Sequence, residues 1–246
     1  MEKHESSAQL KARARSQLLG KYGTLIPALL VVEGCMLLLS TLTTFSLDTR
    51  TLSGLTFQFV IEFLLQLFAG IFLAGQTFLY LNVACGGKIS VSDVFYGFTH
   101  HPDRAILIQL LQLLLCLAYF IPFFICMGLW AAMDSPVVLM IPLSLAFCIG
   151  LTGTVVLSLQ YSQSFYILLD FPEFTALQCL RFSREVMKGN KARLFYLNVS
   201  FLPMYLLGLC TCCIGFVFII PYFNAANTCF YLELMLYRNR QGAGGT

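Results

Sequence analysis

Long stretches without a charged residue constrain this chain more than any other feature. Four such runs cover residues 63–87, 105–133, 135–169 and 194–232. Roughly 20 predominantly apolar residues are enough to cross a bilayer as a helix, so each run accommodates at least one span and the last accommodates two. The composition agrees, because 58% of the residues are hydrophobic and only 11% are charged. An all-α polytopic membrane protein is therefore expected.

The boundaries of six transmembrane helices follow from these runs and from the apolar segment before them. The basic N-terminal arm is not followed by a short apolar segment with a small-residue cleavage site, so the first apolar segment is expected to be retained as a span. Residues 1–246 are expected to form a single integral membrane domain. The expected spans are residues 24–45, 55–81, 105–130 and 137–169, with two more in 194–232 divided at 208–215. Five spans with an unbroken final helix is the competing interpretation.

The placement of the basic residues distinguishes these two topologies. With six spans, fourteen of the fifteen Lys and Arg residues fall on one side and Arg50 alone on the other. Cytoplasmic loops retain an excess of Lys and Arg, so both termini are predicted to be cytoplasmic. Five spans would leave Arg238 and Arg240 on the outer side.

The segment 173–193 reads as a basic amphipathic helix. Apolar or small residues recur at helical spacing from Ala176 to Met187, and charged residues occupy the opposite arc. Such a helix is typical of the boundary between hydrocarbon and anionic headgroups, although packing on the protein itself explains the pattern equally well. The residues expected to contact anionic inner-leaflet lipids or a protein partner are Arg181, Arg184, Lys188, Lys191 and Arg193.

An internal repeat is suggested by three capping-box patterns, Ser6 with Gln9, Ser90 with Asp93 and Thr175 with Gln178, spaced 84 and 85 residues apart. The inward-going spans end on similar motifs, Gln76-Thr77-Phe78, Gln163-Ser164-Phe165 and Thr228-Cys229-Phe230. These similarities predict three tandem helical hairpins, each preceded by an amphipathic cytoplasmic elbow helix, in repeats 1–85, 86–171 and 172–246. Parallel repeats of this kind can enclose a shared pocket.

Polar side chains inside the predicted spans are the candidates for a ligand or ion path. Glu33 and Glu62 have no basic residue in any predicted span to neutralise them, so each is expected to be protonated, hydrated in a cavity or paired with a cation. A protonated glutamate bonded to a neighbouring helix is the alternative. Amides form a second set, and such groups commonly hold helices together. The candidates from this set are Gln76, Gln163, Asn224 and Asn227.

Signatures of enzymes and cofactors are scarce. Most of the ten cysteines lie in predicted spans, where they act as small hydrophobic residues, and the Cys210, Cys212 and Cys213 cluster has no nearby His or carboxylate to complete a metal site. His100 and His101 beside Asp103 are better explained as a solvated turn. We therefore expect no metal, no cofactor and no enzymatic activity, with an intramembrane enzyme left as a remote alternative. The basic elbows lie next to spans, so lipid is expected there rather than nucleic acid.

A family resemblance covers most of the chain. Residues 181–195 (RFSREVMKGNKARLF), Gly215 with Pro221-Tyr222, and Phe230-Tyr231 before Glu233 resemble the C-terminal half of an uncharacterised bacterial integral-membrane family, domain of unknown function 975. Residues 13–20 and 94–98 are similar as well. The resemblance implies a multi-pass protein of the bacterial cytoplasmic membrane and supplies no catalytic residues. The cysteine-rich turn 209–215 departs from the family pattern.

Two functions are consistent with these features. The first is binding or transport of a small or amphiphilic molecule, based on Glu33 and Glu62. The second is a non-catalytic scaffold or partner subunit of an envelope or membrane assembly, based on the basic elbows.

Overall fold

The computed structural model describes residues 5–46, 51–133, 137–211 and 214–243, and in these ranges the protein consists of helices without strands. The expected all-α class is confirmed. In chain order the elements are α1 (Ser7–Leu18), α2 (Tyr22–Ser46), α3 (Leu52–Ala84), η1 (Val91–Phe95), α4 (Tyr96–Thr99), α5 (Pro102–Ala132), η2 (Val137–Leu139), α6 (Met140–Tyr161), α7 (Ser164–Asp170), α8 (Ala176–Val186), α9 (Lys191–Val199), α10 (Leu202–Cys210) and α11 (Phe216–Ala243).

Five helical segments within the described residues are long and apolar enough to cross a membrane: Tyr22–Phe45, Ser53–Ala84, Pro102–Trp130, Val137–Asp170 and Lys191–Cys210. The first four agree with the expected spans. The protein is therefore membrane-embedded. In the last apolar run α10 ends at Cys210 and α11 begins at Phe216, and α10 packs against α11, so this run is not one unbroken helix.

Helix α11 is less apolar than these five segments because it carries Asn224, Asn227 and Glu233. Its middle is enclosed by the rest of the protein, since Ala226, Cys229, Phe230 and Tyr231 are fully buried there. A helix surrounded by other helices does not need the hydropathy of a lipid-facing one.

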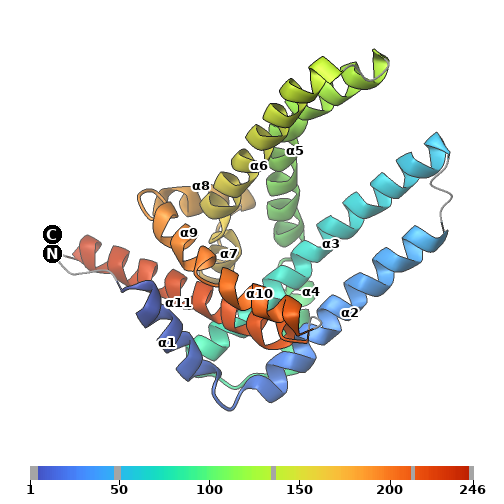
Figure 1. Ribbon diagram of the computed structural model, residues 1–246. Coiled ribbons are helices and arrows are strands. Elements are labelled where there is room, and N and C mark those ends of the chain that lie inside the picture. The colour runs from blue at the N-terminus through green and yellow to red at the C-terminus, as the bar shows by residue number, and fades with distance from the viewer. Residues whose placement is uncertain (1–4, 47–50, 134–136, 212–213, 244–246) are drawn as a thin grey trace.

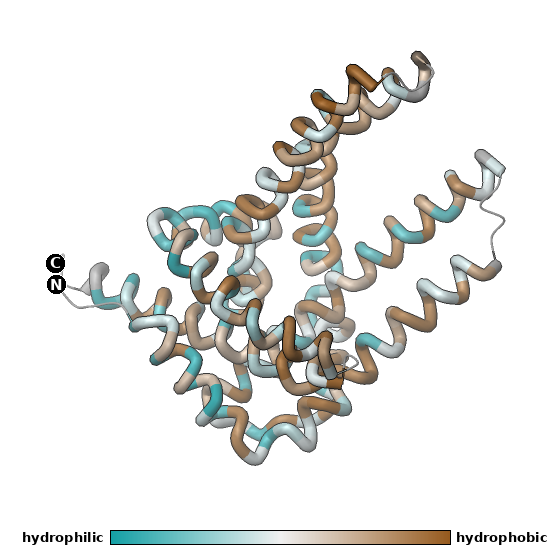
Figure 2. The backbone as a smooth tube through the Cα atoms, in the orientation of Figure 1, coloured by the Kyte–Doolittle hydropathy of each residue, from teal (hydrophilic) through white to brown (hydrophobic). Residues whose placement is uncertain are grey.

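Two long hairpins diverge from the rest of the molecule, α2 with α3 and α5 with α6 (Figure 1). Their outer parts expose large apolar side chains such as Leu37, Ile121 and Ile149. Figure 2 shows hydrophobic residues along both hairpins and hydrophilic residues gathered on α1, α8 and the end of α11. Exposed apolar surface on this scale matches helices whose surroundings are hydrocarbon.

The core lies where the hairpins converge on α11. One cluster joins α1, α2, α3, α9 and α11, with Phe201 and Phe230 among its fully buried residues. A second cluster joins α3, α5, α7, α8 and α11 around Ile167 and Tyr231. Because α3 and α11 belong to both clusters, they hold the other helices together.

All three predicted capping boxes are formed, at Ser6, Ser90 and Thr175. In each, the side chain of the cap and that of the residue three positions later satisfy backbone N–H groups at the helix start. Glycines follow α1 and α8, since Gly20 has φ 78° and Gly189 has φ 79°. This left-handed conformation carries little penalty in glycine and lets the chain turn out of the helix into the next one.

The predicted amphipathic helix is α8, and its apolar stripe faces the protein. Ala176, Cys179, Leu180, Ser183 and Val186 are buried against α5, α6 and α7. Of the two explanations for the pattern, packing on the protein itself is the one observed. The stripe is therefore not available for insertion into lipid, and only the basic arc faces outward.

Helix α3 and the η1–α4 segment touch through their backbones. A Cβ atom on Gly75 would lie 1.7 Å from the carbonyl oxygen of Val94, and one on Gly97 would lie 2.2 Å from that of Ile71. Only glycine fits at distances this short. Gly75 therefore fixes how closely the η1–α4 segment approaches α3, one residue before the candidate Gln76.

Candidate functional site

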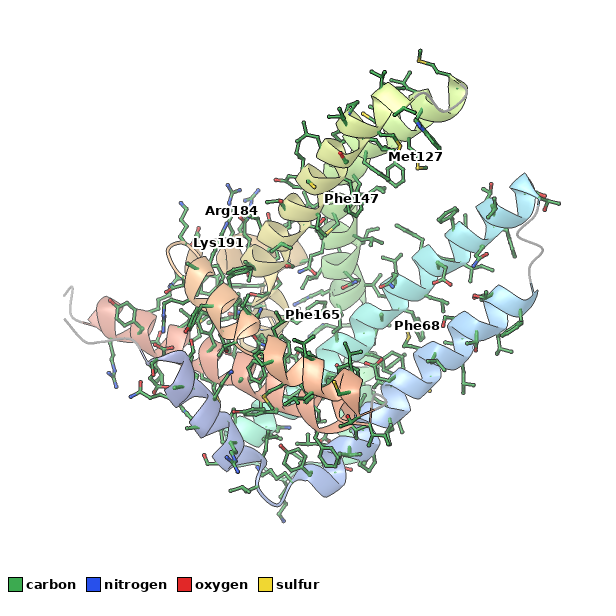
Figure 3. All side chains as sticks on the ribbon, in the orientation of Figure 1. Phe68, Met127, Phe147, Phe165, Arg184 and Lys191 are labelled. Atoms are coloured by element: carbon green, nitrogen blue, oxygen red, sulfur yellow. The ribbon has the colours of Figure 1, made fainter. Side chains whose placement is uncertain are left out.

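A cavity of about 260 Å³ lies inside the junction of the hairpins. Its walls come from α3, from α6 and α7, from α9 and from α11. Phe165, one of its lining residues, is labelled in Figure 3 near the middle of the molecule. Four of the six predicted path residues line it together: Gln76, Gln163, Asn224 and Asn227.

Two of these amides stand in motifs of the same form. Gln76 on α3 and Gln163 at the start of α7 stand in the same position of their motifs, each followed by a hydroxyl residue and a phenylalanine. Asn224 and Asn227 precede the third motif on α11. All four amides line the same cavity, so helices from distant parts of the sequence converge on it.

Gln163 is buried in the wall of the cavity. Its side chain is only 1% exposed, and its Nε2 donates to Ser162 Oγ at 2.8 Å. Its Oε1 has no hydrogen-bond partner among the described residues. The buried Asn198 Oδ1, on another wall of the same cavity, also has none there. Leaving a buried acceptor without a donor costs roughly 1–3 kcal/mol, so a ligand that supplied a donor to either atom would be favoured.

Other polar groups of the cavity are held by the protein. Asn227 Nδ2 donates to the Phe223 carbonyl at 3.0 Å, and the Thr77 hydroxyl donates to the Leu73 carbonyl at 2.7 Å. The hydroxyls of Tyr166 and Thr228 lie 3.1 Å apart. The remaining amides of the lining, Gln76, Asn198 and Asn224, carry both donors and acceptors, so the lining suits a neutral ligand that forms hydrogen bonds.

The lining, as far as the structure describes it, contains no Asp, Glu, Lys, Arg or His side chain. It combines amides and hydroxyls with apolar and aromatic side chains. Burying an unpaired ion in such a place would be expensive. The chemistry suits a small neutral molecule, or the neutral end of an amphiphile.

Glu33 and Glu62 are not among the residues lining the cavity. Glu33 is exposed on α2, and Glu62 is partly buried on α3. Neither makes a hydrogen bond or ion pair with any residue in the described ranges. The structure thus brings the four predicted amides together and leaves the two predicted carboxylates on the first hairpin.

The five predicted basic contacts divide into two groups. Arg181, Arg184 and Lys188 are exposed on the outer arc of α8 and the turn after it. Lys191 Nζ instead donates to Gln160 Oε1 at 2.6 Å, and Arg193 Nη2 bonds both carboxylate oxygens of Glu233 at 2.8 and 2.9 Å.

Sequence reasoning missed the hydroxyl groups of the site. Tyr80, Tyr166, Ser158 and Ser162 line the cavity together with the amides. The signal for the tyrosines was present, because each inward-going motif is followed within two residues by tyrosine. Nothing in their spacing distinguishes the two serines from the many others in the spans.

The histidine and cysteine candidates lie elsewhere. His100 stacks on Tyr96 with ring centroids 4.0 Å apart, and Cys210 is exposed at the end of α10, while Cys212 and Cys213 fall outside the described residues. Within the described ranges, no three His, Cys, Asp or Glu side chains are grouped so that they could hold a metal ion.

Comparison with known proteins gives a family and nothing more specific. No curated protein and no solved structure matches the chain. The family model described as "Protein of unknown function (DUF975)" matches residues 1–237, nearly the whole sequence. The chain therefore belongs to the DUF975 family.

Proposed function

We propose that this is a multi-pass protein of the bacterial cytoplasmic membrane, with six spans and both termini in the cytoplasm. Helix α11 serves as the sixth span beside α10, and the three hairpins are tandem repeats 1–85, 86–171 and 172–246, each introduced by a capped elbow. The strongest support is the basic-residue distribution, which leaves Arg50 alone on the outer side. The left-handed Gly20 and Gly189, each fourteen residues after its cap, support the equivalence of the first and third elbows.

We further propose that the protein binds or transports a small neutral or amphiphilic molecule in the cavity, and that it is not an enzyme. The observation that carries this proposal is the buried Gln163 Oε1 acceptor, which belongs to a residue of the cavity wall and has no donor among the described residues. Chains retain such costly groups where a ligand completes them.

Flux of glycerol and urea into proteoliposomes, followed by stopped-flow light scattering, tests this proposal. The protein should accelerate entry of at least one of these neutral, hydrogen-bonding probes. Ser162→Phe, which fills the cavity, should abolish the acceleration. Gln112→Leu is the matched control, because Gln112 donates to the Tyr161 carbonyl outside the cavity. Acceleration that survives Ser162→Phe would remove the cavity from the pathway.

A scaffold or partner subunit is the second candidate function. It is favoured by Arg181, Arg184 and Lys188, three exposed cations without an ion-pair partner among the described residues. Reversing all three charges should then disrupt a partner complex that crosslinking detects in cells, while Ser162→Phe leaves it intact.

A further inference from the structure

A second hollow lies on the outside of the molecule, between α6 and α9, with a volume of about 490 Å³. Its walls are apolar: Leu151, Val155, Val156 and Leu159 come from α6 and Phe195 from α9. The cationic Lys191, at the start of α9, also lines it. We call this hollow the α6–α9 groove.

The dimensions of the groove suit a lipid chain. Its α6 wall runs from Leu151 to Leu159, which spans roughly 12 Å at about 1.5 Å per helical residue. One leaflet contributes roughly 15 Å of the hydrocarbon thickness of a bilayer. Both walls belong to helices long and apolar enough to cross the membrane, so the groove opens toward hydrocarbon.

The charge of Lys191 is not neutralised by the protein. Its Nζ bonds Gln160 Oε1, a neutral amide oxygen, and no carboxylate in the described ranges lies within ion-pair distance. Figure 3 shows Lys191 and Arg184 at the same end of the molecule, where α8 leads into α9. A partly buried cation at the end of an apolar groove is complementary to an amphiphile with an anionic head.

We propose that the α6–α9 groove binds one anionic phospholipid, with an acyl chain along Val155, Val156 and Phe195 and the phosphate against Lys191. The inference builds on the proposed orientation, in which the α8–α9 turn meets the cytoplasmic leaflet. In this proposal Lys191 binds the phosphate of one lipid at a defined site, rather than contributing only a general positive charge to the surface.

The groove and the central cavity are separate sites with different chemistry. Leu159 borders both, so α6 forms the wall between them. The cavity is lined by neutral polar groups, whereas the groove is apolar with one cation. Variants in one site therefore leave the chemistry of the other intact.

Quenching of a tryptophan placed in the groove by brominated lipids tests the proposal. Trp130 is the single native tryptophan, so Phe195→Trp in a Trp130→Phe background reports on the groove alone. The protein is reconstituted in phosphatidylcholine with increasing brominated phosphatidylglycerol. Val156→Trp, on the facing wall, is a second reporter if the first variant does not fold. Quenching should show a preference for phosphatidylglycerol over brominated phosphatidylcholine.

Adding Lys191→Gln should lower this preference about fivefold, the usual contribution of one basic residue near anionic lipid. Lys188→Gln is the control, since Lys188 is exposed and does not line the groove, and should leave the preference unchanged. Equal quenching by both lipids, or a preference that survives Lys191→Gln, would overturn the proposal. Ser162→Phe distinguishes this proposal from the proposed function. If this variant loses probe flux but keeps the lipid preference, only the cavity takes part in flux.

Discussion

Arg193 on α9 holds Glu233 on α11 through both carboxylate oxygens, at 2.8 and 2.9 Å. The pair also captures the chain before α1, because Glu233 Oε1 accepts from the Glu5 N–H at 3.0 Å and Arg193 donates to the Glu5 carbonyl at 3.2 Å. The side chains are 25% and 10% exposed. One charge-assisted ion pair, made through a single guanidinium nitrogen, therefore ties the chain before α1 to α9 and α11.

Glu233→Gln should destabilise the protein by about 2 kcal/mol, because it removes the charge that the partly buried Arg193 faces and weakens two charge-assisted hydrogen bonds. The apparent unfolding temperature in detergent measures the loss. Glu185→Gln is the matched control: its contact with Arg238 is at 4.0 Å and exposed, and such pairs contribute little. Equal unfolding temperatures for both variants would show that the buried pair does not hold the elbow.

Gly75→Ala should cost about 2 kcal/mol, since the added methyl group must push the η1 backbone away from α3. Gly34→Ala on α2 meets no atom within 4 Å and should be neutral or slightly stabilising, because alanine favours helix. Unfolding temperatures of the two variants test this pair. A stable Gly75→Ala variant would contradict the close approach of elbow and helix.

Local patterns in the sequence predicted the parts of the fold that depend on local physics. The apolar runs predicted the long helices, and a capping box such as that of Thr175 requires only residues three positions apart. Whether a helix face contacts lipid or protein depends on residues that are distant in the sequence. The stripe on α8 is equally compatible with lipid and protein, and only the packing of α5, α6 and α7 against it decides.

Cys179 on α8 should resist alkylation in the folded protein. It is fully buried, and this burial raises the pKa of its thiol to about 11. At pH 8 roughly one molecule in a thousand would then carry the reactive thiolate. Maleimide at pH 8 should label the exposed Cys85 and spare Cys179 until the protein unfolds. Mass spectrometry of the labelled peptides reads this out, and rapid labelling of Cys179 would contradict the packing of α8.

The burial of Cys179 also makes the stability of the folded protein depend on pH. Because the folded-state pKa of Cys179 is raised, its contribution to stability is present below the pKa of the unfolded thiol, near 9, and is lost as the pH rises toward 11. Cys179→Ala should lose less stability than the parent protein between pH 9 and 11, as chemical unfolding curves would show. Parallel losses in both proteins would contradict a buried neutral thiol.

The proposed topology predicts that Asn239→Cys, in an otherwise cysteine-free protein, stays unlabelled when intact cells meet a membrane-impermeant maleimide. Asn239 is exposed near the end of α11, so it should react once the cells are opened. Reaction in intact cells would place the end of α11 outside and exclude six spans with cytoplasmic termini.

The site was predictable in part for a related reason. Gln76 and Gln163 are recognisable in the sequence as amides inside apolar spans, where a polar group is expected to find a partner. Glu33 and Glu62 were chosen by the cost of burying a charge, a criterion that says nothing about which surface a side chain faces. Asn198 has no counterpart in the motifs, and only the packing of α9 beside α6 and α11 brings it to the cavity.

The response of unfolding temperature to a neutral ligand tests the central claim most directly. Without ligand, Gln163→Leu should be at least as stable as the parent protein, because it removes a buried acceptor that lacks a donor. With a short-chain monoacylglycerol, whose hydroxyls can donate to that acceptor, the parent should gain stability with concentration and Gln163→Leu should not. An equal gain in both proteins, or none in the parent, would contradict the assignment of the cavity as a ligand site.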